Sequence, residues 1–143
     1  MNMNFIDTDL LIQHQAGEKL QNIINSKGLK YFLEIENNIL KSLHLTNTVI
    51  ATGGSAVYSQ AGMKNLKQNG IIIFIDTPLE ELKRRVTNMK SRGIACDPGM
   101  SYDELYQQRI NLYRQICDIT VSGKDNILEN TVYEIIEKLT IKE

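Results

Sequence analysis

The sequence predicts an α/β fold, a three-layer arrangement in which a parallel sheet carries helices on both faces. Four strand-like segments alternate with helical segments, and the connections are long enough for crossovers between parallel strands. The segment Ile71-Ile72-Ile73-Phe74-Ile75 is apolar at every position, which is typical of a strand covered on both faces. With 143 residues and 42% apolar content, the chain is expected to form one domain over residues 1–143.

The amino-terminal elements follow from glycines and apolar spacing. A short strand is expected over Asn4 to Ile6, with Asp7-Thr8-Asp9 as the turn that ends it. The next apolar stretch is interrupted by Gly17, which favours two short helices, and Asn25-Ser26-Lys27-Gly28 is expected to close the second. From 29 to 44, apolar residues recur every three or four positions, as in an amphipathic helix on a sheet: Phe32, Ile35, Ile39 and Leu43.

The segment Thr48-Val49-Ile50-Ala51-Thr52 is predicted to be a buried strand that opens into Gly53-Gly54. Ligands of open parallel sheets bind outside the carboxyl ends of strands, and adjacent glycines let backbone N–H groups approach a ligand oxygen. A tight turn without a ligand is the alternative, because short glycine motifs are weak signals. Gly53 and Gly54 are therefore candidate ligand-binding residues.

The elements after the glycine pair are predicted from capping signals. A short helix is expected from Ala61 to Lys67, and the apolar strand follows it. Thr77-Pro78-Leu79-Glu80 combines a capping box with proline at the first helical position, which predicts a helix from Pro78 to about Asn88. Residues 89–100 contain Gly93, Pro98 and Gly99 and are expected to form an exposed, mobile loop.

Three further elements complete the predicted fold. Ser101-Tyr102-Asp103-Glu104 is a second capping box, which opens a helix to about Ile116. A short strand is expected over Ile119 to Val121. Apolar residues at helical spacing from Val132 to Leu139 predict a terminal helix.

The composition excludes several classes of partner. A formal net charge of −1 gives no electrostatic attraction to nucleic acid or to a membrane surface. No apolar run approaches the roughly 20 residues of a membrane helix, and the amino terminus lacks a charged segment followed by an apolar one. We therefore expect a cytoplasmic protein that binds a small molecule. Cys96 and Cys117 are expected to be free thiols.

The arginines are confined to one part of the chain. All five fall in a 31-residue window, whereas the eleven lysines are scattered: the arginines are Arg84, Arg85, Arg92, Arg109 and Arg114. The planar guanidinium binds phosphate or carboxylate through two hydrogen bonds, so this cluster predicts an anion clamp. Surface arginines on two helices are the alternative.

Carboxylates in an Asp-x-Asp segment, a bare glycine pair and a group of arginines together suit phosphoryl transfer, in which a protein mainly positions groups and neutralises charge. In order and spacing, the chain resembles shikimate kinase, a P-loop kinase related to the nucleoside monophosphate kinases. The resemblance spans nearly the whole chain. The matching segments are Phe5-Ile6-Asp7-Thr8-Asp9 with Ile12 and Gly17, Phe32 with Ile35-Glu36, Ala51-Thr52-Gly53-Gly54, and Arg109 with Leu112-Tyr113.

The resemblance implies a kinase that uses ATP and Mg²⁺ to phosphorylate a small hydroxy acid, the 3-hydroxyl of shikimate, in aromatic amino acid biosynthesis. It implies that Asp9 meets the substrate hydroxyls and accepts the proton of the attacking one, and that Asp7 lies near Mg²⁺ through water. Gly53 and Gly54 would give backbone contacts to the substrate. Without the resemblance, Asp7 and Asp9 would be interpreted as turn and helix-cap residues.

Two arginines complete the implied site. The resemblance implies that Arg109 pairs with the substrate carboxylate. It also implies that Arg92, in a loop like the family's lid at about 89–100, closes on the nucleotide phosphates. The alternative for Arg109 is a surface charge on an amphipathic helix, and for Arg92 a solvated loop arginine. A monomer is expected for the family.

The chain departs from the family at three positions. Leu33 stands where the family has a second arginine for the substrate carboxylate, Ser55 replaces the third glycine of the loop, and Arg92-Gly93 replaces Arg-Pro in the lid. Losing one arginine from a carboxylate site should cost about 1.5 to 3 kcal/mol of binding, so the acceptor is open to question.

The sequence contains no G-x-x-x-x-G-K-[ST] motif, and it starts where the family's second strand starts. We therefore expect a truncated or misannotated form of a longer kinase, with ATP binding in doubt. The family's first strand lies between the strands at 48–52 and 71–75, and its removal would leave two unpaired edges.

Two other functions stay open on this sequence. One is a catalytically inactive ligand-binding or partner-binding module that keeps the acceptor pocket and has no nucleotide site. The other is a kinase for a different polyol or acid, which Leu33 favours.

Overall fold

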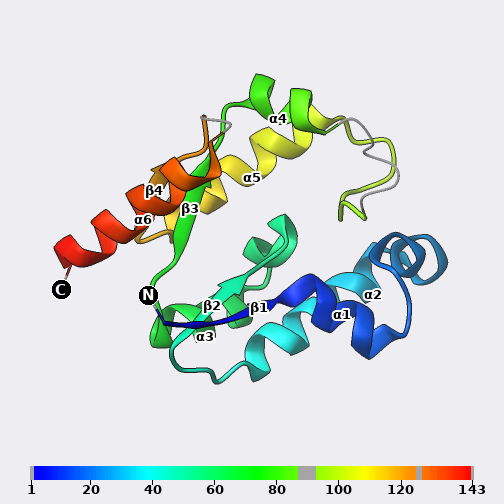
Figure 1. Cartoon of the computed structure of the whole chain (residues 1–143). Helices are drawn as coiled ribbons and strands as arrows, with labels where there is room; N and C mark the ends of the chain where they lie inside the picture. Colours follow the sequence, from blue (N-terminus) through cyan, green and yellow to red (C-terminus); the bar gives the residue numbers. More distant parts are fainter. Residues whose placement is uncertain (1, 87–92, 125–126, 143) are drawn as a thin grey trace. The chain divides into compact units, whose positions relative to one another are not determined.

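The computed structural model describes residues 2–86, 93–124 and 127–142, and Figure 1 shows its elements in order. They are β1 (Asn4–Asp7), α1 (Thr8–Ala16), α2 (Leu20–Ser42), β2 (Thr48–Ala51), the 3-10 helix η1 (Gly54–Tyr58), α3 (Gln60–Asn69), β3 (Ile73–Asp76), α4 (Leu79–Arg85), α5 (Tyr102–Ile116), β4 (Ile119–Ser122) and α6 (Leu128–Lys142). The chain forms two compact units. The first holds Met1–Gly70 and Asn88–Met100, and the second holds Ile71–Thr87 and Ser101–Glu143.

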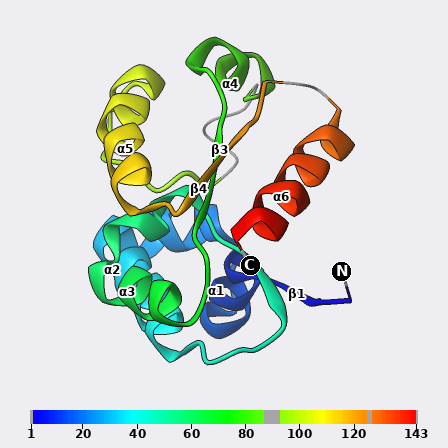
Figure 2. The ribbon, with the colours of Figure 1, turned by 90° about the vertical axis from the view of Figure 1, so that its left-hand side faces the viewer.

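Each unit contains one pair of parallel strands, which confirms the predicted α/β class. In the first unit β1 pairs with β2, so that Asp7 lies opposite Ala51 at the carboxyl ends of both strands. In the second unit β3 pairs with β4, and α5 and α6 lie on opposite sides of this pair (Figure 2). Among the residues that the structure describes, β2 and β3 do not pair with each other.

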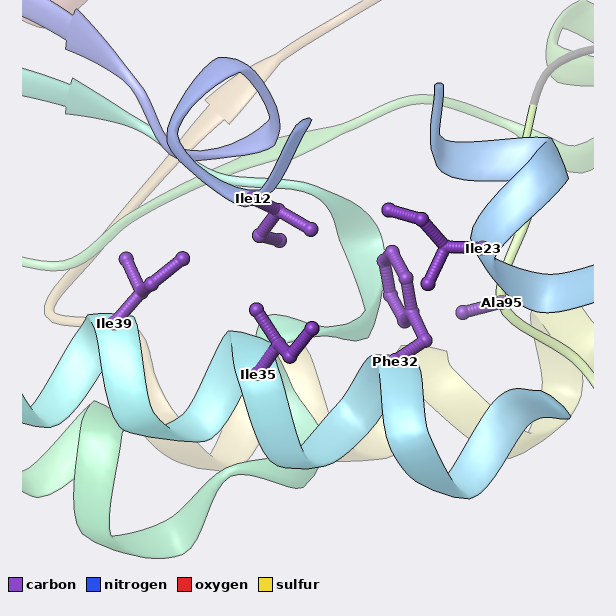
Figure 3. Packing of buried hydrophobic residues seen from close by; sticks show 6 residues of the cluster. All are labelled: Ile12, Ile23, Phe32, Ile35, Ile39 and Ala95. Carbon is purple, nitrogen blue, oxygen red and sulfur yellow. The ribbon is translucent and has the colours of Figure 1, made fainter. Parts of the chain in front are cut away.

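The core of the first unit lies between α1 and the long helix α2. Its buried residues come from α1, α2 and the segment after residue 92, and Figure 3 shows them facing one another: Ile12, Ile23, Phe32, Ile35, Ile39 and Ala95. The predicted stripe on α2 is therefore confirmed at its three buried members. Burying a large apolar side chain contributes about 1.5 to 3 kcal/mol, so this cluster is the main source of the unit's stability.

Two glycines shape this unit as local rules predict, and each of them interrupts the helical backbone. Gly17 has φ 68° and its N–H donates to Gln13 O at 2.9 Å, which closes α1. Gly28 has φ 86°, and helical structure lies on both sides of it. The backbone at Gly28 is non-helical and separates two helical segments that share the label α2, so the predicted break at 25–28 is confirmed.

The loop predicted at 89–100 is exposed at Asp97, Pro98 and Gly99, as expected, but it is buried at Gly93 and Ala95. Gly93, with φ 68°, is buried, and its N–H donates to Gln21 Oε1 at 3.0 Å. Ala95 is only 5% exposed because it packs into the core of the first unit. Met89 and the residues up to Arg92 lie outside the described residues.

The apolar segment 71–75 differs from its prediction in both length and burial. The strand β3 starts at Ile73, two residues late, and Ile71 and Ile75 remain 47% and 50% exposed. The expectation of a strand covered on both faces is therefore wrong at these positions. Among the described residues, β4 is the strand that pairs with β3.

The first predicted capping box is wrong and the second is confirmed. Pro78 is the N-cap of α4 and makes no side-chain hydrogen bond to the helix. The Thr77 hydroxyl, which was predicted to cap this helix, donates instead to Gly123 O at 3.5 Å. The helix ends at Arg85, short of the predicted Asn88. At α5, Glu104 N donates to Ser101 Oγ at 3.2 Å and Ser101 N donates to Glu104 Oε2 at 2.8 Å.

None of the helices in the described part of the chain is both long enough and apolar enough to span a bilayer.

Candidate active site

The segment Asp7-Thr8-Asp9 joins β1 to α1, and its first carboxylate caps the helix. Asp7 Oδ1 accepts a hydrogen bond from Asp9 N at 2.9 Å, and Asp7 has the extended φ and ψ of an N-cap. Asp7 is therefore the N-cap of α1, as expected for this residue without the family resemblance. A carboxylate has further acceptor sites, so capping does not stop Asp7 from also meeting a hydrated cation.

The second carboxylate of this segment lies in the first turn of α1 and is half-buried. Burial, and after it the negative charge of Asp7, raise the pKa of Asp9. A carboxylate with a raised pKa holds a proton more readily than an exposed one. Asp9 is therefore suited to accept a proton from a hydroxyl group that binds beside it.

The glycine loop lies directly against Asp9. A Cβ atom on Gly53 would stand 2.7 Å from Asp9 Oδ1, which is closer than real Cβ atoms approach an oxygen. The register of β1 and β2 explains this contact, because Asp7 and Ala51 end their parallel strands at the same edge. The structure thus brings together two of the residues that the sequence singled out, Asp9 and Gly53.

A buried threonine separates the two aspartates. Thr8 is 0% exposed, and its Oγ1 is the buried side-chain oxygen or nitrogen that has no hydrogen-bond partner within the described ranges. An unsatisfied buried hydroxyl costs about 1 to 3 kcal/mol. The start of α1 therefore carries a destabilising polar group between Asp7 and Asp9.

The loop after the glycines is fastened to α2 by two serine hydroxyls. Ser55 Oγ donates to Glu36 Oε1 at 3.0 Å, and Ser59 Oγ donates to Asn37 Oδ1 at 2.6 Å. Glu36 and Ser55 are 1% and 4% exposed, so the first of these bonds is shielded from water. Ser59 also accepts from Gly62 N at 3.0 Å and so caps α3.

A cavity of about 270 Å³ opens beside this loop, within the first unit. Its walls come from α2 and from the segment after the glycines: Leu33, Glu36, Asn37, Tyr58, Ser59 and Gln60. Leu33, the residue that replaces an arginine of the family, is therefore a cavity residue. The wall that it forms is apolar, next to the carboxylate of Glu36.

Glu36 and the Ser55 hydroxyl are residues to which the sequence assigned no role. Glu36 follows Ile35 on the buried side of an amphipathic helix, and a charged residue at a buried position of such a stripe is the signal that could have identified it. The bond to Ser55 spans 19 residues, and sequence spacing alone does not predict it.

Arg109 belongs to the second unit, where α5 carries it on its buried side together with Leu105 and Ile110. It is 8% exposed, so the alternative of a surface charge is wrong. Buried arginines are held by anionic or polar groups, which keeps Arg109 a candidate for binding an acid. Arg92 lies outside the described residues.

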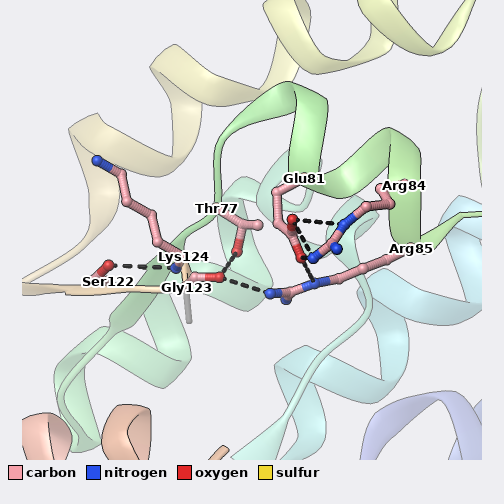
Figure 4. A network of polar contacts seen from close by, with 7 residues as sticks. All are labelled: Thr77, Glu81, Arg84, Arg85, Ser122, Gly123 and Lys124. Carbon is pink, nitrogen blue, oxygen red and sulfur yellow. Dashed lines mark hydrogen bonds and ion pairs between the residues drawn. The ribbon is translucent and has the colours of Figure 1, made fainter. Parts of the chain in front are cut away.

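The other arginines of the second unit make local ion pairs. Arg84 Nη2 and Arg85 Nε lie 2.7 Å and 2.6 Å from Glu81 oxygens, one turn earlier on α4 (Figure 4). Arg85 Nη2 also donates to Gly123 O at 3.0 Å. Arg114 lies 3.5 Å from Asp76. For Arg84 and Arg85 these contacts fit the alternative of surface arginines on a helix rather than an anion clamp.

A larger cavity of about 420 Å³ lies in the second unit at the carboxyl ends of β3 and β4. Its lining includes three cations, Arg114, Lys124 and Lys138, and two anions, Asp76 and Glu134. Lys138 already lies 2.7 Å from Glu134, so the charges of this cavity partly neutralise one another.

The residues present fit Mg²⁺ better than they fit a nucleotide. Magnesium binds through one or two carboxylates and keeps several waters, and Asp7 can supply one such carboxylate. In the described part of the chain, no three acidic, histidine or cysteine side chains gather around one point. The sequence has no glycine-rich phosphate-loop motif, so no group of this chain is assigned to cradle a triphosphate.

Comparison with known proteins gives one consistent result. The family model for shikimate kinase matches residues 1–140. A shikimate kinase of Caldanaerobacter subterraneus subsp. tengcongensis is 33% identical over 139 residues, which cover 95% of this chain and 81% of the relative. One from Microcystis aeruginosa is 36% identical over 143 residues, covering 97% of this chain and 72% of the relative.

Solved structures agree with the sequence comparison. The shikimate kinase of Aquifex aeolicus has a TM-score of 0.79 and 30% identity, covering 99% of this chain and 82% of that one. The shikimate kinase of Acinetobacter baumannii, solved in complex with shikimate, has a TM-score of 0.87 and covers 99% of this chain and 80% of that one. At 24% identity, this second likeness concerns the fold alone.

Proposed function

The chain belongs to the shikimate kinase family, whose enzymes phosphorylate shikimate with ATP in aromatic amino acid biosynthesis, and from this premise we propose that its first unit binds the acceptor alcohol. The observation that carries the proposal is the contact between Asp9 and Gly53 at the carboxyl ends of β1 and β2. This is the edge where open parallel sheets bind ligands.

Asp9 is proposed as the group that accepts the proton of the attacking hydroxyl. Its carboxylate is half-buried and its pKa is raised, first by burial and then by Asp7. A base works best when its pKa moves toward the operating pH, since it then both holds the correct charge and takes up the proton readily. In the transfer, the hydroxyl oxygen would bond to the γ-phosphorus of ATP, the bond from that phosphorus to the ADP oxygen would break so that ADP leaves, and Asp9 would receive the hydroxyl proton.

The glycines are proposed to bind the acceptor through their backbone. Gly53 has no Cβ, so a ligand oxygen can approach the N–H groups of Gly53 and Gly54 next to Asp9. Arg109 is proposed to bind the substrate carboxylate, which its planar guanidinium matches in shape and charge. Arg92 is proposed to close on the nucleotide phosphates.

ATP and Mg²⁺ are the co-substrate and metal of the family, and their use by this chain is part of the proposal. Asp7 would hold Mg²⁺ through water, and the metal would neutralise charge on the transferred phosphoryl group. A cytoplasmic location and a monomeric state also remain predictions.

Thermal unfolding with separate ligands tests the proposal. Shikimate at about 100 times its Kd should stabilise the chain by about 2.7 kcal/mol, and ATP with Mg²⁺ is measured alone and together with shikimate. Asp9→Asn keeps the shape of the side chain but removes the charge, so it should abolish phosphate transfer in a coupled assay. If shikimate does not raise Tm for the wild-type chain, the proposed acceptor site is wrong.

A further inference from the structure

We infer that Ser55 is a positioning residue for the acceptor site, because its hydroxyl binds the buried carboxylate of Glu36 and thereby holds the Gly53-Gly54 backbone beside Asp9. This inference rests on the proposed function of the first unit, and it concerns a residue at which the chain departs from its family. Ser55 itself does not touch the acceptor.

The bond between Ser55 and Glu36 has the properties of a strong anchor. The Oγ–Oε1 distance is 3.0 Å, and the two residues are 4% and 1% exposed. Exclusion of water strengthens a hydrogen bond, because the local dielectric constant is low. Because Glu36 lies in the middle of the long helix α2, this bond ties the loop to a rigid element.

The bond acts next to two residues whose side chains cannot hold the loop. Gly53 and Gly54 have no side chains that could fix them, and glycine is the residue with the greatest backbone freedom. The turns that follow rest on 3-10 type bonds, Ala56 N to Gly53 O at 3.2 Å and Ser59 N to Ala56 O at 2.9 Å. Bonds of this type have poor geometry, so they hold a loop weakly.

Ser55 is also the first residue after the glycines that carries a hydrogen-bonding side chain. Its bond to Glu36 therefore acts at the glycine end of η1, whereas the bond between Ser59 and Asn37 acts at the far end. Loss of the second bond would free the start of α3 and leave the glycines fixed. Loss of the first would free Gly53 to move away from Asp9, the contact on which acceptor binding depends.

Two departures from the family meet at this carboxylate. Leu33 and Glu36 line the same cavity, and Ser55 donates to Glu36. On one side of Glu36, the apolar Leu33 stands where the resemblance places an arginine. On the other side, Ser55 stands where the resemblance places a glycine. The Ser55 hydroxyl thus supplies a polar contact to Glu36 that a glycine side chain cannot make.

The test compares Ser55→Ala and Ser55→Gly with Ser42→Ala in the whole chain. Ser42 also donates a hydrogen bond, to Ile39 O at 2.8 Å, but it lies at the end of α2 and lines no described cavity. Three quantities are measured for each variant: the Tm, the Kd for shikimate by calorimetry, and the hydrogen exchange of the bonded amides of Ala56 and Ser59.

Ser55→Ala should raise the Kd for shikimate by about threefold to tenfold and speed the exchange of the Ala56 amide by a similar factor, since a buried hydrogen bond is worth about that much. Ser55→Gly should have a larger effect because it adds backbone freedom. Ser42→Ala should change neither quantity, even if its Tm falls as far as that of Ser55→Ala.

Two results would overturn the inference. One is a Ser55→Ala variant whose Kd equals that of the wild type. The other is exchange that rises equally in amides throughout the first unit, which would mean a general loss of stability rather than a local one. If the wild-type chain does not bind shikimate, the proposed function fails, and the Ala56 amide still decides whether Ser55 fixes the loop.

Discussion

Asp9 and Gly53 lie so close together that a Cβ atom on residue 53 would come within 2.7 Å of the Asp9 carboxylate. The contact joins the start of a helix to the end of the neighbouring strand, 44 positions apart by their numbers (53 − 9). Glycine at this position therefore leaves room for the Asp9 carboxylate, whose pKa is raised by burial and then by the charge of Asp7.

Gly53→Ala should separate stability from ligand binding. The backbone at Gly53 has φ −65° and ψ 160°, which alanine adopts without strain, so the free energy of unfolding should change by less than about 1 kcal/mol. Asp9 must move, however, and the Kd for shikimate should rise at least about tenfold because a displaced group loses its alignment. Chemical denaturation and calorimetry measure the two effects.

Gly70→Ala is the matched control for this prediction. Gly70 ends α3 in the same unit, and a Cβ there would meet only Leu66 O, at 3.3 Å. Its Kd for shikimate should equal that of the wild type. Equal Kd values for Gly53→Ala and the wild type would mean that Asp9 does not bind the acceptor.

Asp9 should make stability depend on pH in a defined direction. Its folded pKa is raised above the ordinary 3.8, so between these two values the folded state binds more protons than the unfolded state. The Asp9 contribution is therefore full below pH 3.8 and is lost as pH rises through the folded pKa. Asp9→Asn removes this loss, so the variant should gain stability over the wild type with rising pH.

Urea unfolding of both proteins from pH 3.5 to 8 gives this difference directly, because the other titrating groups cancel. The exposed residue Asp97 provides the control Asp97→Asn. A difference between Asp9→Asn and the wild type that stays constant over the whole range would contradict a raised pKa.

Thr8→Val should stabilise the chain by about 1 kcal/mol. Thr8 is fully buried and its hydroxyl has no hydrogen-bond partner within the described residues, so an apolar group of the same shape removes a desolvation penalty. Differential scanning calorimetry measures the gain.

Thr131→Val is the opposite case and serves as its control. Thr131 is 9% exposed, and its hydroxyl donates to Ser122 O at 3.3 Å. The same substitution should therefore destabilise by about 0.5 to 1.5 kcal/mol. If both variants change stability with the same sign, the Thr8 hydroxyl has a partner in solution.

Local signals in the sequence were sufficient where a residue acts on its neighbours. Gly17 ends α1, and Ser101 with Glu104 forms the predicted box at α5, because both depend on residues within four positions. Thr77 has the same local pattern, yet its hydroxyl turns to Gly123, 46 positions away. A long-range acceptor that the sequence does not reveal therefore displaced the predicted cap.

In the candidate site, too, some contacts could be predicted from the sequence and others could not. The order of strands in a parallel sheet made the meeting of Asp9 and Gly53 predictable. The anchoring of Ser55 by Glu36 was not predictable, since helical periodicity predicts which side of α2 is buried but not which loop residue reaches it. Exposure of Ile75 depends on which strands pair with β3, and this too is a tertiary property.

Gly123→Ala should destabilise the second unit. A Cβ at this position would collide with Thr77 Oγ1 and would stand 3.0 Å from Ile75 Cγ2, in the network that Figure 4 shows. Overpacking of this kind costs about 1 to 3 kcal/mol. Thr77→Ala removes the colliding hydroxyl, so the double variant should recover part of the loss, and a double-mutant cycle measures the coupling. Strict additivity would show that the two residues do not touch.

Leu33→Arg should strengthen the binding of shikimate. Leu33 lines the cavity of the first unit at the position where the family has an arginine, and the cavity wall that it forms is apolar. A second guanidinium there can pair with the substrate carboxylate. The binding free energy should become more favourable by about 1.5 to 3 kcal/mol, which lowers the Kd at least about tenfold. Leu33→Met keeps the volume and the apolar character, so its Kd should stay within a factor of about three of the wild type.

Measuring each variant also with shikimate's reduced analogue, in which the carboxylate is an alcohol, shows whether the gain needs the negative charge. A tighter Kd for the acid but not for the alcohol assigns the effect to charge pairing, whereas no gain with either ligand would mean that the acceptor of this chain does not place an anion beside Leu33.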